Sequence, residues 1–169
     1  MNSADLLIDA FGRVQEITTQ VVGGLTPEQL TYRPAADVNS IAWLVWHLTR
    51  IQDDHVAAAA GSEQVWISAG WAERFELPFS PAATGYGHGP QEVAAVVVKS
   101  GGLLTGYHDA VCGRTTSYLR DLTDADLDRV VDESWHPPVT LGVRLVSIIS
   151  DDLQHAGQAA YLRGIITRW

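Results

Sequence analysis

Four long stretches of this sequence carry apolar residues at the three- and four-residue spacing of an α-helix. In the first stretch, for example, Leu7, Phe11, Val14 and Val21 fall on one helical face. Apolar stripes of this kind predict helices that bury one side and expose the other. No alternating pattern typical of a β-strand competes with them. The sequence therefore predicts an all-α protein.

Helices are expected over residues 4–22, 40–60, 90–122 and 141–167. The candidate N-caps are Ser3, Asn39 and Thr140. Gly23 and Gly61 directly follow the first two helices and can end them. The third helix is expected to bend near Gly101-Gly102. A chain of 169 residues suits one domain over 1–169, and a four-helix bundle is the simplest way to bury these faces.

A long segment, residues 62–89, separates the second and third expected helices and shows no clear period. It is rich in Gly and Pro, and its aromatic residues are Trp66, Trp71, Phe75, Phe79 and Tyr86. A loop of this length in a compact domain is usually functional or faces a partner. We expect it to wall a pocket or to belong to an interface.

Charge and composition exclude several kinds of partner. The chain has 11 Lys and Arg against 20 Asp and Glu, a formal charge of −9, and no basic run. Nucleic acid and anionic membrane surfaces are therefore not expected partners. No apolar stretch approaches the roughly 18 residues that a membrane span needs, and no signal peptide is apparent. The lone Cys112 allows no internal disulfide, which suits the cytoplasm.

Three residues form the constellation most able to carry chemistry. His47 lies mid-helix on a mostly apolar face, which normally points inward. Asp151 and His155 are four residues apart, so they lie one turn apart on one face of the fourth helix; this spacing favours Asp151 over Asp152. Two imidazoles and a carboxylate from facing helices can bind one divalent metal and leave a position open. Zinc is the expected metal, with nickel and iron as alternatives.

Two more residues have expected roles beside this site. Arg144, seven residues before Asp151, is a candidate to bind an anionic substrate, and Asp54, seven after His47, is a candidate to orient a metal ligand. Plainer interpretations remain open. A mid-helix histidine is more often a hydrogen-bonded core residue, and Arg144 can be an ordinary salt-bridge partner. The remaining histidines of the helices and the long segment are not expected to be ligands: His55, His88 and His108.

Two motifs point to a family. Residues 39–48 read Asn-Ser-Ile-Ala-Trp-Leu-Val-Trp-His-Leu, and residues 151–158 read Asp-Asp-Leu-Gln-His-Ala-Gly-Gln. Together they resemble the DinB-like superfamily, and look most like its actinobacterial branch, which includes the metal-binding domain of mycothiol-dependent maleylpyruvate isomerase. The resemblance covers nearly the whole chain. It implies a four-helix bundle, often a homodimer, with a metal near one end.

The sequence also departs from that isomerase. Asp151 stands where the isomerase has the longer Glu, which affects the ligand distance. The chain reaches residue 169 just after the fourth expected helix and has no counterpart of the isomerase's extra C-terminal domain. We therefore do not expect maleylpyruvate isomerase itself.

The resemblance implies a metal-dependent thiol S-transferase that combines a low-molecular-weight thiol of the mycothiol type with a small electrophile. A thiol at the open metal position loses its proton and becomes a strong nucleophile, so the protein needs no catalytic cysteine. One alternative is a hydrolase that uses metal-activated water. Another is a non-catalytic helical module that dimerises through an apolar face. Metal analysis of the purified protein separates this module from the two enzymes.

Overall fold

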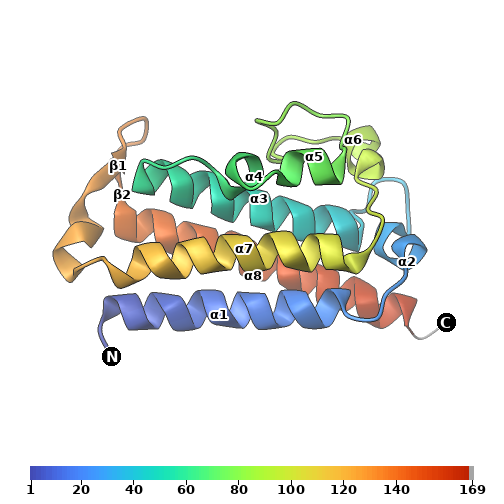
Figure 1. Cartoon of the computed structure of the whole chain (residues 1–169), viewed down its shortest axis with the longest axis horizontal. Helices are drawn as coiled ribbons and strands as arrows, with labels where there is room; N and C mark the ends of the chain where they lie inside the picture. Colours follow the sequence, from blue (N-terminus) through green and yellow to red (C-terminus); the bar gives the residue numbers. More distant parts are fainter. Residues whose placement is uncertain (168–169) are drawn as a thin grey trace.

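Four long helices packed side by side make up most of the computed structural model, which describes residues 1–167 (Figure 1). They are α1 (Ser3–Val22), α3 (Ile41–Ala60), α7 (Gly101–Arg120) and α8 (Leu141–Ile166). The shorter helices are α2 (Pro27–Thr31), α4 (Val65–Ser68), α5 (Trp71–Phe75), α6 (Pro90–Ala95) and the 3₁₀ helix η1 (Asp124–Asp128). The predicted all-α four-helix fold is confirmed.

The predicted ends of α1, α3 and α8 lie within one residue of the observed ends, but two of the caps differ. Asn2 rather than Ser3 caps α1, because its side chain accepts a hydrogen bond from the backbone of Asp5. Ser40 rather than Asn39 caps α3. Thr140 caps α8 as predicted, and Gly61 ends α3 in the left-handed conformation, at φ 63°.

The single helix predicted over residues 90–122 is wrong, since α6 and α7 are separate helices joined by an extended stretch. Val96 and Val98 are buried while Val97 is exposed, which is the alternation of an extended chain. Three consecutive β-branched residues also disfavour a helix. Gly101, expected at a bend, instead begins α7 against α1, where an added Cβ would lie 2.6 Å from Val22 Cγ1.

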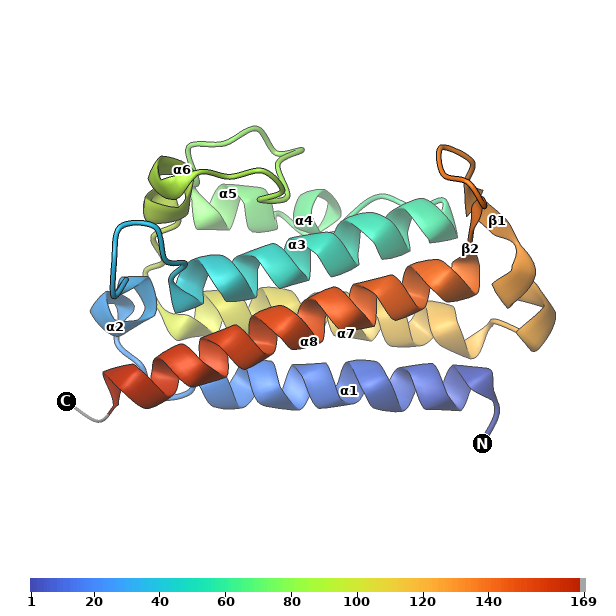
Figure 2. The same ribbon diagram turned by 180° about the vertical axis from the view of Figure 1, so that it is seen from behind.

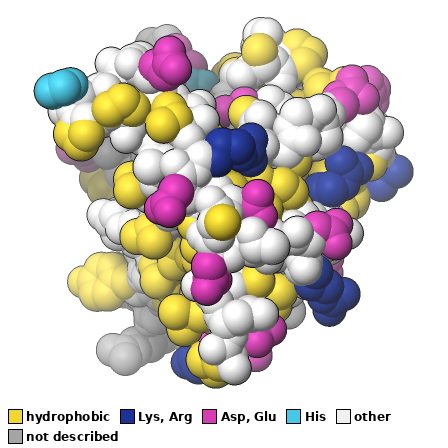
Figure 3. Space-filling view, turned by 90° about the vertical axis from the view of Figure 1, so that its left-hand side faces the viewer, with side chains coloured by type: hydrophobic (Ala, Val, Ile, Leu, Met, Phe, Trp, Pro, Cys, Tyr) yellow, Lys and Arg dark blue, Asp and Glu magenta, His cyan; other side chains and the backbone are white. Residues whose placement is uncertain are grey.

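Short elements cover one long side and one end of the bundle. The segment 62–89 is not an open loop, because α4 and α5 pack on α3 and α7 and bury Trp66 and Phe75 (Figure 1). At one end of the bundle an unpredicted antiparallel pair, β1 (Val130–Asp132) and β2 (Val139–Thr140), leads into α8 (Figure 1). Hydrophobic, acidic and basic side chains are interspersed on that end (Figure 3). Within residues 1–167, no helix is long and apolar enough to cross a membrane.

A polar layer divides the hydrophobic core into two clusters. One cluster surrounds Trp43 and Trp46, and the other surrounds Phe11 and Leu145. Along each long helix, buried polar residues or the thiol of Cys112 fall at or near the boundary between the two clusters: Thr18, Thr49, Gln52, His108, Cys112, Thr115 and Asp152. We call this set the polar layer. It joins α3 to α7, because Thr49 Oγ1 lies 3.1 Å from His108 Nδ1 and Gln52 donates to Thr115 at 2.8 Å.

Burial shifts the pKa of each titratable member of the polar layer in the direction that favours its neutral form. Burial lowers the pKa of His108 to about 4 and raises the pKa of Cys112 to about 12. Burial, reinforced by the charge of Asp151, also raises the pKa of the Asp152 carboxyl well above its usual range. These shifts have one physical cause, which is that a buried charge without a partner is costly.

Candidate metal centre

His47, Asp151 and His155 meet between α3 and α8, which lie next to each other (Figure 2). One possible ligand atom from each residue lies within 4.8 Å of the others. His155 Nε2 is 3.6 Å from Asp151 Oδ1. Two ligands of a tetrahedral ion with bonds of about 2.1 Å are about 3.4 Å apart, so this pair is nearly at ligand spacing.

The helical geometry of α8 decides which of the two adjacent aspartates joins the site. Asp151 and His155 are one turn apart on the face toward His47, whereas Asp152 is rotated by about 100° and is fully buried in the polar layer. The side chains of His155 and Asp151 keep 18% and 37% of their surface exposed, while His47 keeps 6%. A small molecule can therefore reach the site from the α8 side.

The Nδ1 atom of each imidazole is already hydrogen-bonded. His47 Nδ1 lies 2.7 Å from the carbonyl oxygen of Thr84, and His155 Nδ1 lies 3.2 Å from Gln158 Oε1. A backbone carbonyl oxygen only accepts, so the neutral His47 ring carries its proton on Nδ1 and keeps a free lone pair on Nε2. Burial is the largest cause that lowers the pKa of His47, which favours the neutral form that a metal requires.

Asp151 supplies an acceptor that nothing in the described part of the chain satisfies. Its Oδ2 is buried and has no hydrogen-bond partner among residues 1–167. Buried polar atoms are rarely left without a partner, and a cation held between the carboxylate and two Nε2 atoms would provide one. The donor set therefore fits a divalent ion with two nitrogen ligands and one oxygen ligand.

Trp43 holds both imidazoles in place. Its ring stacks on His47 with centroids 4.5 Å apart and 17° between the planes, and it meets the His155 ring edge-on at 6.1 Å. Trp43 is one turn before His47 on α3, so the helix itself sets the stacked arrangement.

The DinB superfamily model matches residues 10–159 of the sequence. The chain belongs to this superfamily. Among solved structures, this DinB-superfamily chain is similar to a conserved protein from Enterococcus faecalis, with a TM-score of 0.93 and 34% sequence identity over 100% of this chain and 99% of that chain. No curated protein matches the sequence. The family expected from the two motifs is thus confirmed.

In this DinB-superfamily protein, the Arg144 side chain forms an ion pair with Asp132. It is therefore not an unpaired cation next to the candidate metal ligands. Its Nη2 donates to Asp132 Oδ2 at 2.7 Å, and both side chains are partly buried. His55 lies nearby, and burial followed by the charge of Arg144 lowers its pKa. Arg144 thus has a carboxylate partner within the chain, as the plainer interpretation of the sequence allows.

Asp54 does not touch the metal ligands directly. It accepts a hydrogen bond from Gln64 Nε2 at 2.7 Å and lies 3.8 Å from His55. The direct contacts that orient His47 and His155 come from Thr84 and Gln158, which sequence reasoning missed. The contact with Gln158 could have been predicted, because its side-chain amide comes three residues after His155 on the same helix. The contact with Thr84 could not, because every residue has the same backbone carbonyl.

The remaining histidines lie outside the ligand group. His88 Nδ1 accepts a hydrogen bond from Trp43 Nε1 at 3.3 Å, and its ring stacks on Trp46. His108 is fully buried in the polar layer. Neither is one of the three residues that group as candidate ligands.

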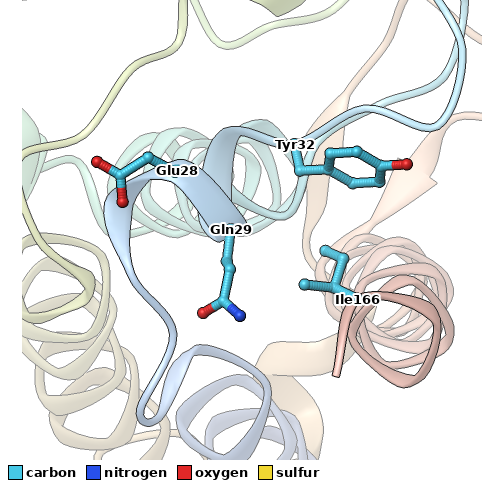
Figure 4. Close-up of a pocket in the computed structure, with 4 residues that line it drawn as sticks. All are labelled: Glu28, Gln29, Tyr32 and Ile166. Carbon is cyan, nitrogen blue, oxygen red and sulfur yellow. The ribbon is translucent and has the colours of Figure 1, made fainter. Parts of the chain in front are cut away.

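One hollow on the surface lies apart from the metal centre. It has a volume of about 510 Å³ and is lined by Glu28, Gln29 and Tyr32 of α2 and by Ile166 of α8 (Figure 4). Ile166 comes eleven residues after His155, about 16 Å further along the helix. A smaller apolar groove of about 280 Å³ comes nearer, since its lining includes Gln158.

Proposed function

We propose that this single-domain chain is a cytoplasmic metal-dependent enzyme in which His47, Asp151 and His155 hold one divalent ion, zinc by preference. The observation that carries the proposal is that His47, Asp151 and His155 each bring a possible ligand atom within 4.8 Å of the others, and that Asp151 also has a buried carboxylate oxygen without a hydrogen-bond partner among residues 1–167. Three protein ligands leave a coordination position for a small molecule, as in catalytic zinc sites. Membership of the DinB superfamily supports the same conclusion.

The proposed reaction is thiol S-transfer with a low-molecular-weight thiol, of the mycothiol type, as cosubstrate and a small electrophile as acceptor. A bound divalent ion supplies a charge that lowers the pKa of a thiol or a water molecule. The protein's own thiol is unsuited to the role of nucleophile, because Cys112 is buried and burial raises its pKa to about 12. The nucleophilic sulfur must therefore come from a cosubstrate.

Arg144 is the proposed contact for a carboxylate of either substrate. Because one of its nitrogens already donates to Asp132, an anionic substrate has to displace that carboxylate or use the remaining N–H groups of the guanidinium. A neutral thiol meets no such competition.

Removal and return of zinc tests the proposal. Protein stripped with a chelator is expected to lose transfer of a thiol to a model electrophile, and to regain it when zinc is added. His155→Ala is expected to stay inactive in zinc, because two ligands cannot hold the ion firmly. His136→Ala changes an exposed histidine in the β1–β2 turn and serves as the matched control. Thiol transfer that persists in His155→Ala would rule the mechanism out.

The same experiment separates the alternatives. If zinc restores cleavage of esters or amides without any thiol, the site is hydrolytic. If the purified protein contains no metal and zinc changes neither its activity nor its melting temperature, the chain is a non-catalytic helical module.

We also propose that the chain forms a homodimer through the outward face of α8. Val143, Val146, Leu153 and Tyr161 are exposed on this face, and apolar positions of this kind suit an interface core. Leu153→Glu is expected to shift the protein from dimer to monomer in sedimentation equilibrium, because it buries a charge in each subunit. An unchanged mass would contradict this interface.

A further inference from the structure

The loop over residues 81–88 contacts His47, one of the three candidate metal ligands. The carbonyl oxygen of Thr84 lies 2.7 Å from His47 Nδ1. Gly85 follows at φ +94°, and a Cβ at this position would lie 2.6 Å from His47 Nδ1 and 3.0 Å from the Trp46 ring. A side chain at residue 85 would therefore meet the imidazole itself. Only glycine can adopt this positive φ and also let the backbone at residue 85 come so close to the His47 ring.

Both ends of this loop are fixed to α3. At the start, the fully buried Arg50 donates from Nε to the Ala83 carbonyl at 3.1 Å and from Nη2 to the Pro81 carbonyl at 3.4 Å. At the end, His88 accepts a hydrogen bond from Trp43, the residue whose ring stacks on His47. The loop therefore has little freedom to move away from the ligand.

We infer that the 81–88 loop is the element that positions His47 for the metal. The Thr84 carbonyl keeps the proton of the imidazole on Nδ1 and so directs Nε2 toward Asp151 and His155. Arg50 and His88 keep that carbonyl in place. Groups that orient a metal ligand in this way typically change metal affinity by about 10- to 100-fold when they are lost. This inference rests on the metal site proposed above.

A chain of hydrogen bonds gives Asp54 an indirect part in the same arrangement. Asp54 accepts from Gln64, and Gln64 accepts from Arg50 Nη1 at 2.8 Å. Arg50 in turn holds the Ala83 carbonyl, next to Thr84. The orienting role expected for Asp54 thus reaches His47 through Arg50 and the loop.

Two glycines of the loop provide a matched pair of variants. Gly85 and Gly87 both have positive φ, +94° and +77°, so alanine brings comparable backbone strain at either position. Only at residue 85 does the added Cβ strike His47; at residue 87 nothing lies within 4 Å. Gly85→Ala is expected to raise the zinc dissociation constant about 10- to 100-fold, while Gly87→Ala is expected to match the wild type. Competition with a chromophoric chelator measures these constants.

The visible absorption of the cobalt-substituted protein provides the second measurement. Gly85→Ala is expected to change the band positions, because His47 is displaced from the ion, and Gly87→Ala is not. Equal zinc affinity and equal spectra in the two variants would overturn the inference while leaving the metal site intact. A wild-type protein that binds neither zinc nor cobalt would overturn the proposed function, and the inference with it.

If Gly85→Ala does not fold, variants of His88 at the other end of the loop test the same inference. His88→Leu removes the acceptor of the Trp43 N–H and is expected to weaken zinc binding. His88→Asn keeps a carbonyl acceptor there and is expected to restore it. If His88→Leu leaves both the zinc affinity and the cobalt spectrum unchanged, the loop does not position the ligand.

Discussion

Zinc at about 1,000 times its dissociation constant is expected to raise the free energy of unfolding of the wild-type chain by about 4 kcal/mol, and to leave that of His47→Ala unchanged. The reason is that the site needs α3 and α8 side by side, so only the folded chain offers all three ligands. Without the imidazole of His47, the two residues on α8 remain, and they chelate an ion weakly.

Thermal unfolding with and without zinc measures this difference for each variant. His47→Ala also loses the contact with Thr84, so the informative quantity is the zinc-dependent change within a variant and not the stability of the metal-free protein. His136→Ala is expected to keep the full zinc effect. A zinc-dependent rise in His47→Ala as large as that of the wild type would show that the ion binds elsewhere.

Asp53→Ala is expected to lower the free energy of unfolding by about 3–5 kcal/mol, because it leaves a buried cation without its counter-charge. The Asp53 carboxylate lies 3.7 Å from Arg50 Nη1, and both side chains are almost completely buried. It also accepts hydrogen bonds from the backbone of Val65 and Trp66 and from the Tyr107 hydroxyl, at 2.7–2.8 Å. One substitution therefore strands several buried donors.

The neighbouring aspartate provides the control. Asp54 is more exposed and, within residues 1–167, accepts one hydrogen bond, from Gln64, so Asp54→Ala is expected to lower the free energy of unfolding by about 1 kcal/mol. Urea denaturation of the metal-free proteins compares the two. If Asp53→Ala lowers the free energy of unfolding no more than Asp54→Ala does, Arg50 must form an ion pair or hydrogen bond with another residue in the variant.

Local signals in the sequence were sufficient for much of the fold and for the grouping of the ligands. The helices α1, α3 and α8 have caps or stops in addition to a long apolar stripe, and their ends follow from these. The pair Asp151 and His155 shares a face because the spacing of four fixes it in any helix. His47 could be added because an apolar helix face points inward.

The features that sequence reasoning missed depend on tertiary contacts. The apolar run of three valines at 96–98 can belong to a buried helix or to a buried extended chain; its β-branched residues favour the extended chain, and the tertiary packing decides between the two. Arg50 and Asp53 are charged, so they suggest an exposed face; they are buried because the 62–89 segment covers that side of α3. The contact with His47 comes from the backbone of Thr84, and a backbone carbonyl is the same for every residue type.

The polar layer has a consequence for the axial register of the helices. Its hydrogen bonds lock α3 against α7, because a one-turn slide would separate Thr49 from His108 and Gln52 from Thr115. Within residues 1–167, no hydrogen bond or ion pair links α3 directly to α8. A metal ion bound by His47, Asp151 and His155 would cross-link α8 to α3 and so oppose sliding of one helix along the other. In metal-free protein we therefore expect the contact between α3 and α8 to open first.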